Sequence, residues 1–303
     1  MEKTELAIAT DFMGEKPELE QIRFLMKQIA DAGFTHIHWC HEWEGDYLYS
    51  VFEMLQIKEW MEEYNLRSKA LHASKGTRRN VNIRREHYRR DYTSDWEYNR
   101  RAGVELIQNR VDMAACLSAR EIVLHLYPPH FTIQEKPETK ENFYTCVYRS
   151  LDELMPYCLD KNVRICLENL FDMPGEYMLE ILDRLFERYP KDFLGLCFDT
   201  GHANMIWGDR TPEVIEKYAD RLYAVHIHDN NGSVDFHRIP GEGNIKWNPI
   251  INLLAHSSYE GPLILELNCY DPEPEIFLEK AYKAGCYLNT LYQTEKYRGQ
   301  EVR

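Results

Sequence analysis

The sequence predicts an α/β protein whose eight parallel strands close into a single (β/α)8 barrel. Eight short apolar or β-branched runs recur along the 303 residues, segments with helical spacing separate them, and no linker rich in Gly, Pro or Ser interrupts the alternation. Because barrels of this kind commonly reach this length as one unit, we expect residues 1–303 to form one domain. No GxGxxG loop follows the first run, which argues against an open dinucleotide-binding sheet.

The expected elements alternate from the first run to the end of the chain. Residues 17–33, 99–117 and 274–292 repeat apolar side chains at helical spacing, and the last of these supplies a final helix. The runs between such segments are short enough for strands and rich in Val, Ile and Leu. The expected strands are residues 6–12, 36–42, 68–74, 121–127, 163–170, 194–200, 222–229 and 262–268.

Composition and charge indicate which partners and which cellular location to expect. With 36 basic and 50 acidic residues the net charge is -14, which disfavours nucleic acid as a partner. The first twelve residues contain no basic segment followed by a long apolar one, and no apolar run reaches the length of a membrane span, so we expect no signal peptide and no membrane partner. The eight cysteines form no close CxxC pair, which indicates reduced thiols. We therefore expect a cytoplasmic protein, and the sequence leaves a homo-oligomer open.

Six successive strands end in a residue that binds metals or protons. In a barrel these ends converge on the active-site face. Because side chains alternate along a strand, the residue two positions earlier shares the inward face, and at each strand that residue is uncharged, from Ala70 on strand three to Ile264 on strand eight. The pattern therefore directs six polar side chains into the barrel mouth: His72, His125, Glu168, Asp199, His226 and Glu266.

Carboxylates packed this closely would repel one another unless cations lie among them, so the set predicts a divalent metal site with mixed nitrogen and oxygen ligands. After Asp199, Gly201 would permit a tight turn that returns His202 to the same centre. Asp235 and His237 are spaced like two ligands on one extended segment, and His228 and Asp229 would orient the ligands. The histidine content favours zinc or manganese.

These motifs resemble the xylose-isomerase-like TIM barrel superfamily, which contains sugar isomerases and epimerases as well as the apurinic-site endonucleases. The resemblance covers nearly the whole chain. Its most specific pieces lie on strands five to eight: "CLENL", "CFDTGHAN", "VHIHDNNGSVDFHRIPGEGNIKW" and "LILELN".

The two branches of this superfamily imply different metal centres. The ketose-epimerase branch implies one metal ion held by Glu168, Asp199, His226 and Glu266. The endonuclease branch implies three ions and adds His72, His125, His202, Asp235 and His237. All nine positions match, so the ligands leave one to three ions open.

Other features favour the isomerase branch. Strand two runs into the acidic and aromatic "HEWEGDYLYS", where Trp43 suits stacking on a sugar. "LHASKG" lacks the Tyr that usually follows the first His ligand in the endonucleases, and the net charge also opposes DNA. The basic segment 75–90 points the other way, since it could hold a phosphate, or it could be a solvated loop. Arg238 lies near the place of a substrate-binding Arg of the epimerases, although the adjacent His237 departs from their pattern.

We therefore expect a metal-dependent isomerase or epimerase of a sugar or sugar phosphate that works through a metal-stabilised enediolate, with Glu168 and Glu266 moving the proton. Two alternatives stay open: a phosphodiesterase of the apurinic-site endonuclease type, and a lyase or dehydratase of a sugar derivative. The residues expected to bind substrate are His202, Arg238, Trp43, Trp207 and Trp247.

Overall fold

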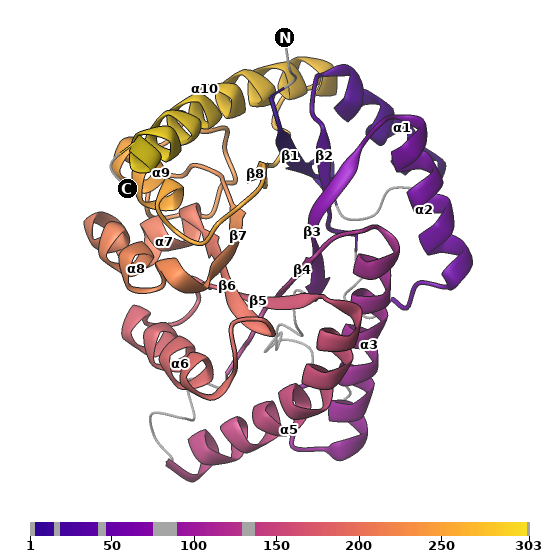
Figure 1. Cartoon of the computed structure of the whole chain (residues 1–303), viewed down its shortest axis with the longest axis vertical. Helices are drawn as coiled ribbons and strands as arrows, with labels where there is room; N and C mark the ends of the chain where they lie inside the picture. The colour runs from indigo at the N-terminus through magenta and orange to yellow at the C-terminus, as the bar shows by residue number, and fades with distance from the viewer. Residues whose placement is uncertain (1–3, 15–18, 42–46, 75–89, 129–136, 302–303) are drawn as a thin grey trace.

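The computed structural model describes residues 4–14, 19–41, 47–74, 90–128 and 137–301. Within them, eight parallel strands form one sheet in the order β7-β6-β5-β4-β3-β2-β1-β8 (Figure 1). Neighbouring strands are thus consecutive in the chain except where β1 lies beside β8. The strands are β1 (Leu6–Ala9), β2 (His36–Trp39), β3 (Arg67–Ser74), β4 (Glu121–Leu124), β5 (Arg164–Glu168), β6 (Leu194–Asp199), β7 (Leu222–His226) and β8 (Leu263–Leu265).

The sheet closes on itself. Strand β1 pairs with β8 in register Ala7 to Ile264. Just beyond β7, Ile227 bridges to Leu265 of β8: its amide donates to the carbonyl of Ile264 at 2.8 Å, and its carbonyl accepts from the amide of Glu266 at 3.2 Å. The strand order together with this bridge confirms the predicted (β/α)8 barrel.

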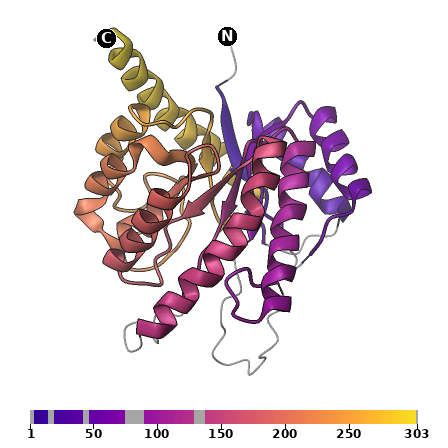
Figure 2. The same ribbon diagram turned by 60° about the horizontal axis from the view of Figure 1, so that its bottom comes forward.

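Helices surround the barrel on its outer side (Figures 1 and 2). The longest described helix, α10 (Pro274–Glu301), arches over β1 and β8 and carries the chain toward its C-terminus (Figure 1). The expected helices at 17–33, 99–117 and 274–292 correspond to α1 (Leu19–Asp31), α3 (Glu97–Cys116) and α10. The α-helices are α1 (Leu19–Asp31), α2 (Val51–Glu63), α3 (Glu97–Cys116), α5 (Pro137–Lys161), α6 (Gly175–Arg188), α7 (Thr200–Ile206), α8 (Thr211–Lys217), α9 (Trp247–Ala255) and α10 (Pro274–Glu301), and the 3-10 helices are η1 (Gly208–Arg210) and η2 (Ala219–Arg221).

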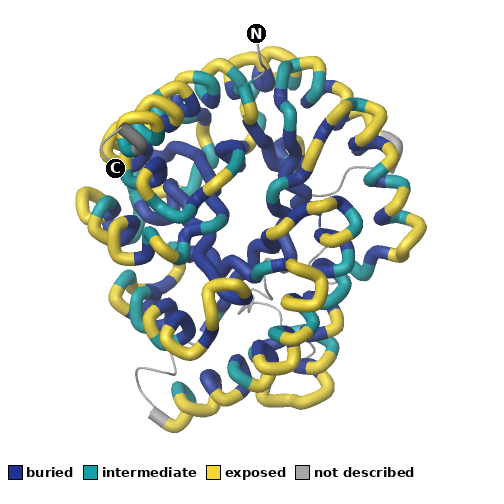
Figure 3. Tube along the Cα trace, viewed as in Figure 1, coloured by how far each residue is buried: buried dark blue, intermediate teal, exposed yellow. Residues whose placement is uncertain are grey.

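Alternation along the strands divides the core into an inner and an outer part. The inward side chains are small: Val123, Cys166, Cys197 and Ala224 contact one another inside the barrel. The outward side chains are larger, and they join the main core under the helices, where the strands are buried and the helices expose only their outer faces (Figure 3). The outward set includes the residue just before the polar residue at each of the ends of strands β3 to β8: Leu71, Leu124, Leu167, Phe198, Val225 and Leu265.

The sequence also leads us to expect reduced cysteines and no membrane span. All eight cysteines lie in the described residues and are free thiols, as the lack of a CxxC pair indicated. Among the described helices, none combines the length and apolarity needed to cross a membrane.

Candidate metal centre

The predicted polar residues gather at the mouth of the barrel. Glu168, Asp199 and His226 are the last residues of β5, β6 and β7, and Glu266 directly follows β8. All four are more than nine-tenths buried, and one ligand atom from each lies within 4.8 Å of the others. Four elements far apart in sequence therefore place three carboxylates and one imidazole around a single point.

His226 shows why this point suits a cation. Its Nδ1 lies 3.1 Å from Oε2 of Glu266, 3.4 Å from Oε2 of Glu168 and 3.8 Å from Oδ2 of Asp199. This buried nitrogen has no hydrogen-bond partner among the described residues. A ring nitrogen and three carboxylate oxygens converging in a buried site are the donor set of a divalent metal ion, so these residues fit the implied metal.

A second cluster shares the Glu168 carboxylate. Oε2 of Glu168 lies 2.9 Å from Nε2 of His125 and 3.5 Å from Nε2 of His72. The hydroxyl of Tyr127 lies 3.1 Å from Nδ1 of His125 and helps to orient that ring. Glu168 thus stands between two groups of ligand atoms and is able to bridge them.

A third cluster lies on the other side of Asp199. Oδ2 of Asp235 is 2.9 Å from Nε2 of His237 and 3.4 Å from Nε2 of His202. The ring of His228 stacks on that of His237 with centroids 4.0 Å apart. Ligand atoms of these four residues also lie within 4.8 Å of one another. The structure therefore brings together all nine residues predicted as ligands, in three adjoining groups.

Without a metal, the centre is a network of charged histidines and carboxylates. Burial by itself raises the pKa values of Glu168 and Glu266, but His226 and its neighbours outweigh it and hold both pKa values well below the usual range. Burial lowers the pKa of His202, yet Asp199, Asp235 and Glu168 raise it well above its ordinary value. Burial opposes protonation of His237 as well, but Asp235 and Glu266 raise its pKa to about 9. Protons on the histidines thus balance the carboxylates that a metal would otherwise neutralise.

Asp199 and His202 lie at the junction of β6 and α7, where the structure differs from the expected tight turn at Gly201. No turn separates Asp199 from His202, because α7 starts at Thr200 and Asp199 caps it by accepting the amide of His202 at 2.7 Å. Gly201 lies inside that helix. A Cβ there would come within 2.0 Å of Cε1 of His228, so glycine is needed for the close approach of a ring rather than for a turn.

His228 and Asp229 hold other parts of the centre in place. Nε2 of His228 lies 3.0 Å from both oxygens of Asp199. The buried carboxylate of Asp229 accepts the amides of Asn230, Gly241 and Ile245 and the indole N–H of Trp247, at 2.8 to 3.2 Å. These hydrogen bonds to Asp229 fix residues at both ends of the segment 230–247. This segment is the loop that carries Asp235 and His237.

Comparison with known proteins shows to which family the chain belongs. A sequence model of the family described as "Xylose isomerase-like TIM barrel" matches residues 26–285. The chain belongs to this family. A protein of Sinorhizobium fredii, "Uncharacterized protein y4fM", is 34% identical over 288 residues, 92% of each chain. The "Inosose dehydratase" of Clostridium tetani is 28% identical over 172 residues, 51% of this chain and 57% of that protein.

Solved structures share the fold of this xylose isomerase-like barrel. "Structure of L-ribulose 3-epimerase" superposes with a TM-score of 0.73 at 14% identity, covering 99% of this chain and 98% of that one. "1.8 A Crystal structure of IOLI protein with a binding zinc atom" superposes with a TM-score of 0.68 at 15% identity, covering 95% and 99%. At these identities the likeness concerns the fold.

A cleft of about 120 Å³ opens beside the ligand clusters of this family member. Aromatic and acidic residues that the sequence did not single out line it next to the ligands: Tyr127 follows β4, and Phe171 and Asp172 follow β5. The ring centroid of Phe171 lies 4.9 Å from that of His202. The cleft is lined by His72, His125, Tyr127, Glu168, Leu170, Phe171, Asp172, His202, Asp235, His237 and Glu266.

Several residues expected to bind substrate lie elsewhere. Trp207 is buried beside Gly175, and Trp247 donates its indole N–H to Asp229. The exposed guanidinium of Arg238 lies over the ring of Phe236, 4.7 Å from its centroid. None of the three lines the described cleft. Trp43 and residues 75–89 of the basic segment lie outside the described residues, so their roles stay predictions.

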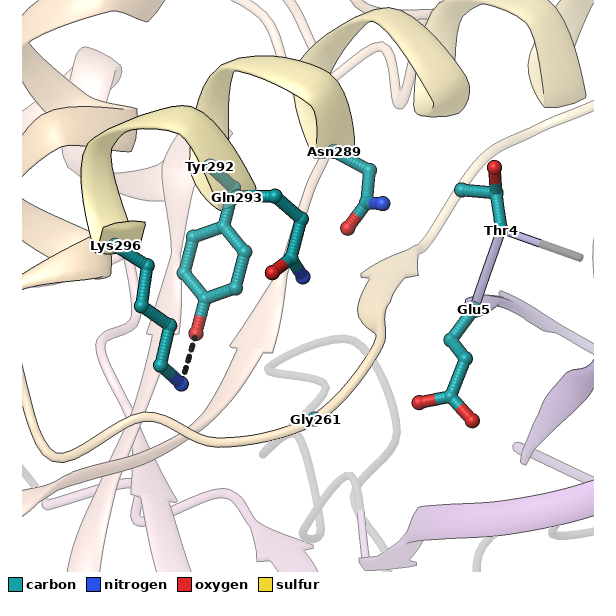
Figure 4. A pocket seen from close by; sticks show the side chains of 7 residues that line it. All are labelled: Thr4, Glu5, Gly261, Asn289, Tyr292, Gln293 and Lys296. Carbon is teal, nitrogen blue, oxygen red and sulfur yellow. Dashed lines mark hydrogen bonds between the residues drawn. The ribbon is translucent and has the colours of Figure 1, made fainter. Parts of the chain in front are cut away.

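A larger cavity, of about 590 Å³, lies beside the N-terminal ends of β1 and β8, and Figure 4 shows the side chains that line it. Its lining comes from the starts of β1 and β8 and from α10, and it contains none of the ligand clusters: Thr4, Glu5, Gly261, Asn289, Tyr292, Gln293 and Lys296. Active sites of such barrels lie at the C-terminal ends of the strands. The smaller cleft, rather than this cavity, is therefore the candidate active site.

Proposed function

We propose that the protein is a metal-dependent isomerase or epimerase that moves a proton next to the carbonyl group of a sugar or sugar phosphate. The observation that carries this proposal is the buried cluster of Glu168, Asp199, His226 and Glu266 beside the cleft. The names of relatives add support: a structural neighbour is an L-ribulose 3-epimerase, and another, IolI, binds zinc. The same cluster is the one-metal set that the resemblance implied.

The chain's own residues divide the work of proton transfer. A divalent metal bound to the four ligands would polarise the substrate carbonyl and stabilise the negative charge that develops on it. Glu168 and Glu266 both line the cleft, where one carboxyl group can be ionised while the other holds a proton. One carboxylate accepts the proton from the carbon, and the other carboxyl group returns a proton. Phe171 and Tyr127 line the cleft around the bound substrate.

A dehydratase would begin with the same step. Relatives that match about half of the chain are named inosose dehydratases. Removal of a proton next to a carbonyl leads to dehydration when a hydroxyl group leaves from the adjacent carbon. The two reactions would therefore use the same residues, Glu168 and Glu266. Their products differ, and the chromatographic assay described below distinguishes them.

The second and third ligand clusters favour a different candidate, a phosphodiesterase. His72 and His125 beside Glu168, and His202 with Asp235 and His237, offer places for two more ions next to the first. Several adjacent metal ions can generate hydroxide from water and stabilise both oxygens of a displaced phosphate. The net charge of -14 opposes binding to DNA, so we rank this function second.

Elemental analysis of the purified protein comes first, because the number of ions separates the candidates. About one zinc, manganese or cobalt ion per chain supports the isomerase, and two or three zinc ions support the phosphodiesterase. The protein is also incubated with Zn²⁺ or Mn²⁺ and then dialysed. Retention of less than a tenth of an ion per chain would contradict both candidate functions.

Activity assays follow on the metal-loaded protein. A panel of ketoses and ketose phosphates, and inosose as the dehydratase substrate, is incubated with the protein and the products are separated by chromatography. Cleavage of a duplex with one abasic site tests the phosphodiesterase. Hydrogen exchange from solvent ²H₂O into the substrate carbon marks the proton transfer, and its absence with every compound that turns over would contradict the proposed mechanism.

A further inference from the structure

His38 is buried beside the candidate metal centre, where it contacts His226. It is the third residue of β2, it is fully buried, and its register partner on β1 is Ala9. Nε2 of His38 lies 3.1 Å from Nε2 of His226, and Nδ1 of His38 lies 2.9 Å from the carbonyl oxygen of Ala70. This histidine thus touches a predicted ligand on the side away from the carboxylates.

These two contacts determine where the protons are. A carbonyl oxygen only accepts hydrogen bonds, so Nδ1 of His38 must carry the proton that bonds to Ala70. The ring is fully buried, and the described residues form no ion pair between it and a carboxylate, so it is neutral and its Nε2 holds a lone pair. Two ring nitrogens 3.1 Å apart need one proton between them, and Nε2 of His226 is the nitrogen that supplies it.

We propose that His38 is a positioning residue that fixes the tautomer and ring orientation of His226. With its proton held at Nε2 by His38, His226 presents the lone pair of Nδ1 to the point where the Glu168, Asp199 and Glu266 carboxylates converge. This inference rests on the proposed function only in taking a metal ion to be the occupant of that point. Among the described residues, the three carboxylates of the cluster do not perform this task, because each of them approaches His226 at Nδ1.

Loss of the His38 acceptor has a defined consequence. In His38→Phe a ring still fills the space, and the Ala70 carbonyl keeps the hydroxyl of Ser68 as a donor at 3.1 Å. The Nε2–H of His226 loses its acceptor, so the ring can rotate and exchange its two nitrogens. Loss of a partner that orients a metal ligand typically weakens metal binding about 10- to 100-fold.

The test measures the affinity of the metal-free protein for Zn²⁺ by competition with a chelator at pH 7.5. His38→Phe should bind zinc at least 10-fold more weakly than the wild type. His38→Gln should recover most of the loss, because its side-chain oxygen can accept the same hydrogen bond. His36→Phe is the matched control: His36 is also a buried histidine on β2, but it bonds to Thr35, and its variant should bind zinc within twofold of the wild type. Equal affinity of His38→Phe and the wild type overturns the proposal.

Nitrogen-15 spectra of the histidine rings supply a readout independent of metal binding. In the metal-free and the zinc-loaded wild type, we expect a slowly exchanging proton on Nε2 of His226 and none on Nε2 of His38. A proton found on Nε2 of His38 overturns the proposal even if His38→Phe fails to fold. A wild type that binds no zinc but shows the expected protons contradicts the proposed function and leaves the role of His38 intact.

Discussion

At the scale of single residues, Glu168 stands out because it takes part in more than one ligand cluster. Its two carboxylate oxygens face four histidines: Oε2 lies 2.9 Å from Nε2 of His125 and within 3.5 Å of His72 and His226, and Oε1 lies 3.2 Å from Nδ1 of His202. This one group is therefore a candidate ligand, a link between clusters and the proposed base. A substitution that keeps the shape of this side chain but removes its charge should affect the chemistry far more than the packing.

We predict that Glu168→Gln lowers kcat about 10²- to 10⁴-fold, the range typical of a removed general base. It should also weaken zinc binding, because a neutral amide replaces an anionic ligand. Product chromatography and zinc titration measure the two effects, and circular dichroism checks the fold. Glu260→Gln, at an exposed position after α9, is the matched control and should leave both unchanged. Full activity in Glu168→Gln would remove this residue from the mechanism.

His36 connects a single buried side chain to acid stability. Burial, with Arg67 nearby, lowers its pKa to about 4 from an ordinary value of 6.5. The unfolded chain therefore binds a proton that the folded protein does not bind between pH 6.5 and pH 4, and stability falls as the pH drops through that window. In the metal-free state, His36→Phe should lose less Tm between pH 7 and pH 4.5 than the wild type. An identical slope of Tm against pH in the two proteins would contradict this account.

At the scale of elements, one buried carboxylate organises the loop after β7. Asp229 accepts three backbone amides and one indole N–H, and these donors come from both ends of residues 230–247. Replacing one oxygen by an NH₂ group turns an acceptor into a donor facing other donors. The loop that carries Asp235 and His237 should then loosen while the barrel stays folded.

We predict that Asp229→Asn destabilises the protein by about 2–3 kcal/mol, since hydrogen bonds to a charged group are lost and buried donors stay unsatisfied. Urea unfolding of the metal-free protein measures this change. Asp209→Asn removes an exposed carboxylate paired with Lys246, and as the matched control it should leave stability nearly unchanged. Equal effects of the two substitutions would show that Asp229 does not hold the loop.

The sequence predicts which strand-end side chains converge at the barrel mouth, because period-two alternation and convergence of parallel strands are local rules. It missed His38 because a search of strand ends three to eight passes over β2, although "HIHW" alternates in the same way and places His36 and His38 inward. Tyr127 and Phe171 escaped because their places depend on how the loops after β4 and β5 pack. The expected turn at Gly201 failed for a related reason: the ring that demands glycine comes from His228, 27 residues further along the chain.

At the scale of the whole molecule, the barrel brings four carboxylates and six histidines from six of its βα units into a small, dry volume. Such a concentration of charge has to be balanced in every state of the protein. In the metal-free state, protons on His202, His226 and His237 provide the balance. When metal ions bind, they must displace those protons, so metal affinity, pH and stability are coupled.

The direction of this coupling follows from the pKa values. Histidines whose pKa is raised in the folded protein stabilise the metal-free form fully below about pH 6.5, and this contribution is lost as the pH rises through the folded value, which is about 9 for His237. Zinc meets less competition from protons over the same range, and a bound ligand stabilises by RT ln(1 + [L]/Kd). The Tm of the metal-free protein should therefore fall between pH 6.5 and pH 9, while the increase in Tm caused by a fixed excess of Zn²⁺ should grow. Differential scanning calorimetry at four pH values, with Mg²⁺ as the weakly binding control, measures both trends, and a zinc-induced increase that shrinks with rising pH would contradict a proton-balanced metal site.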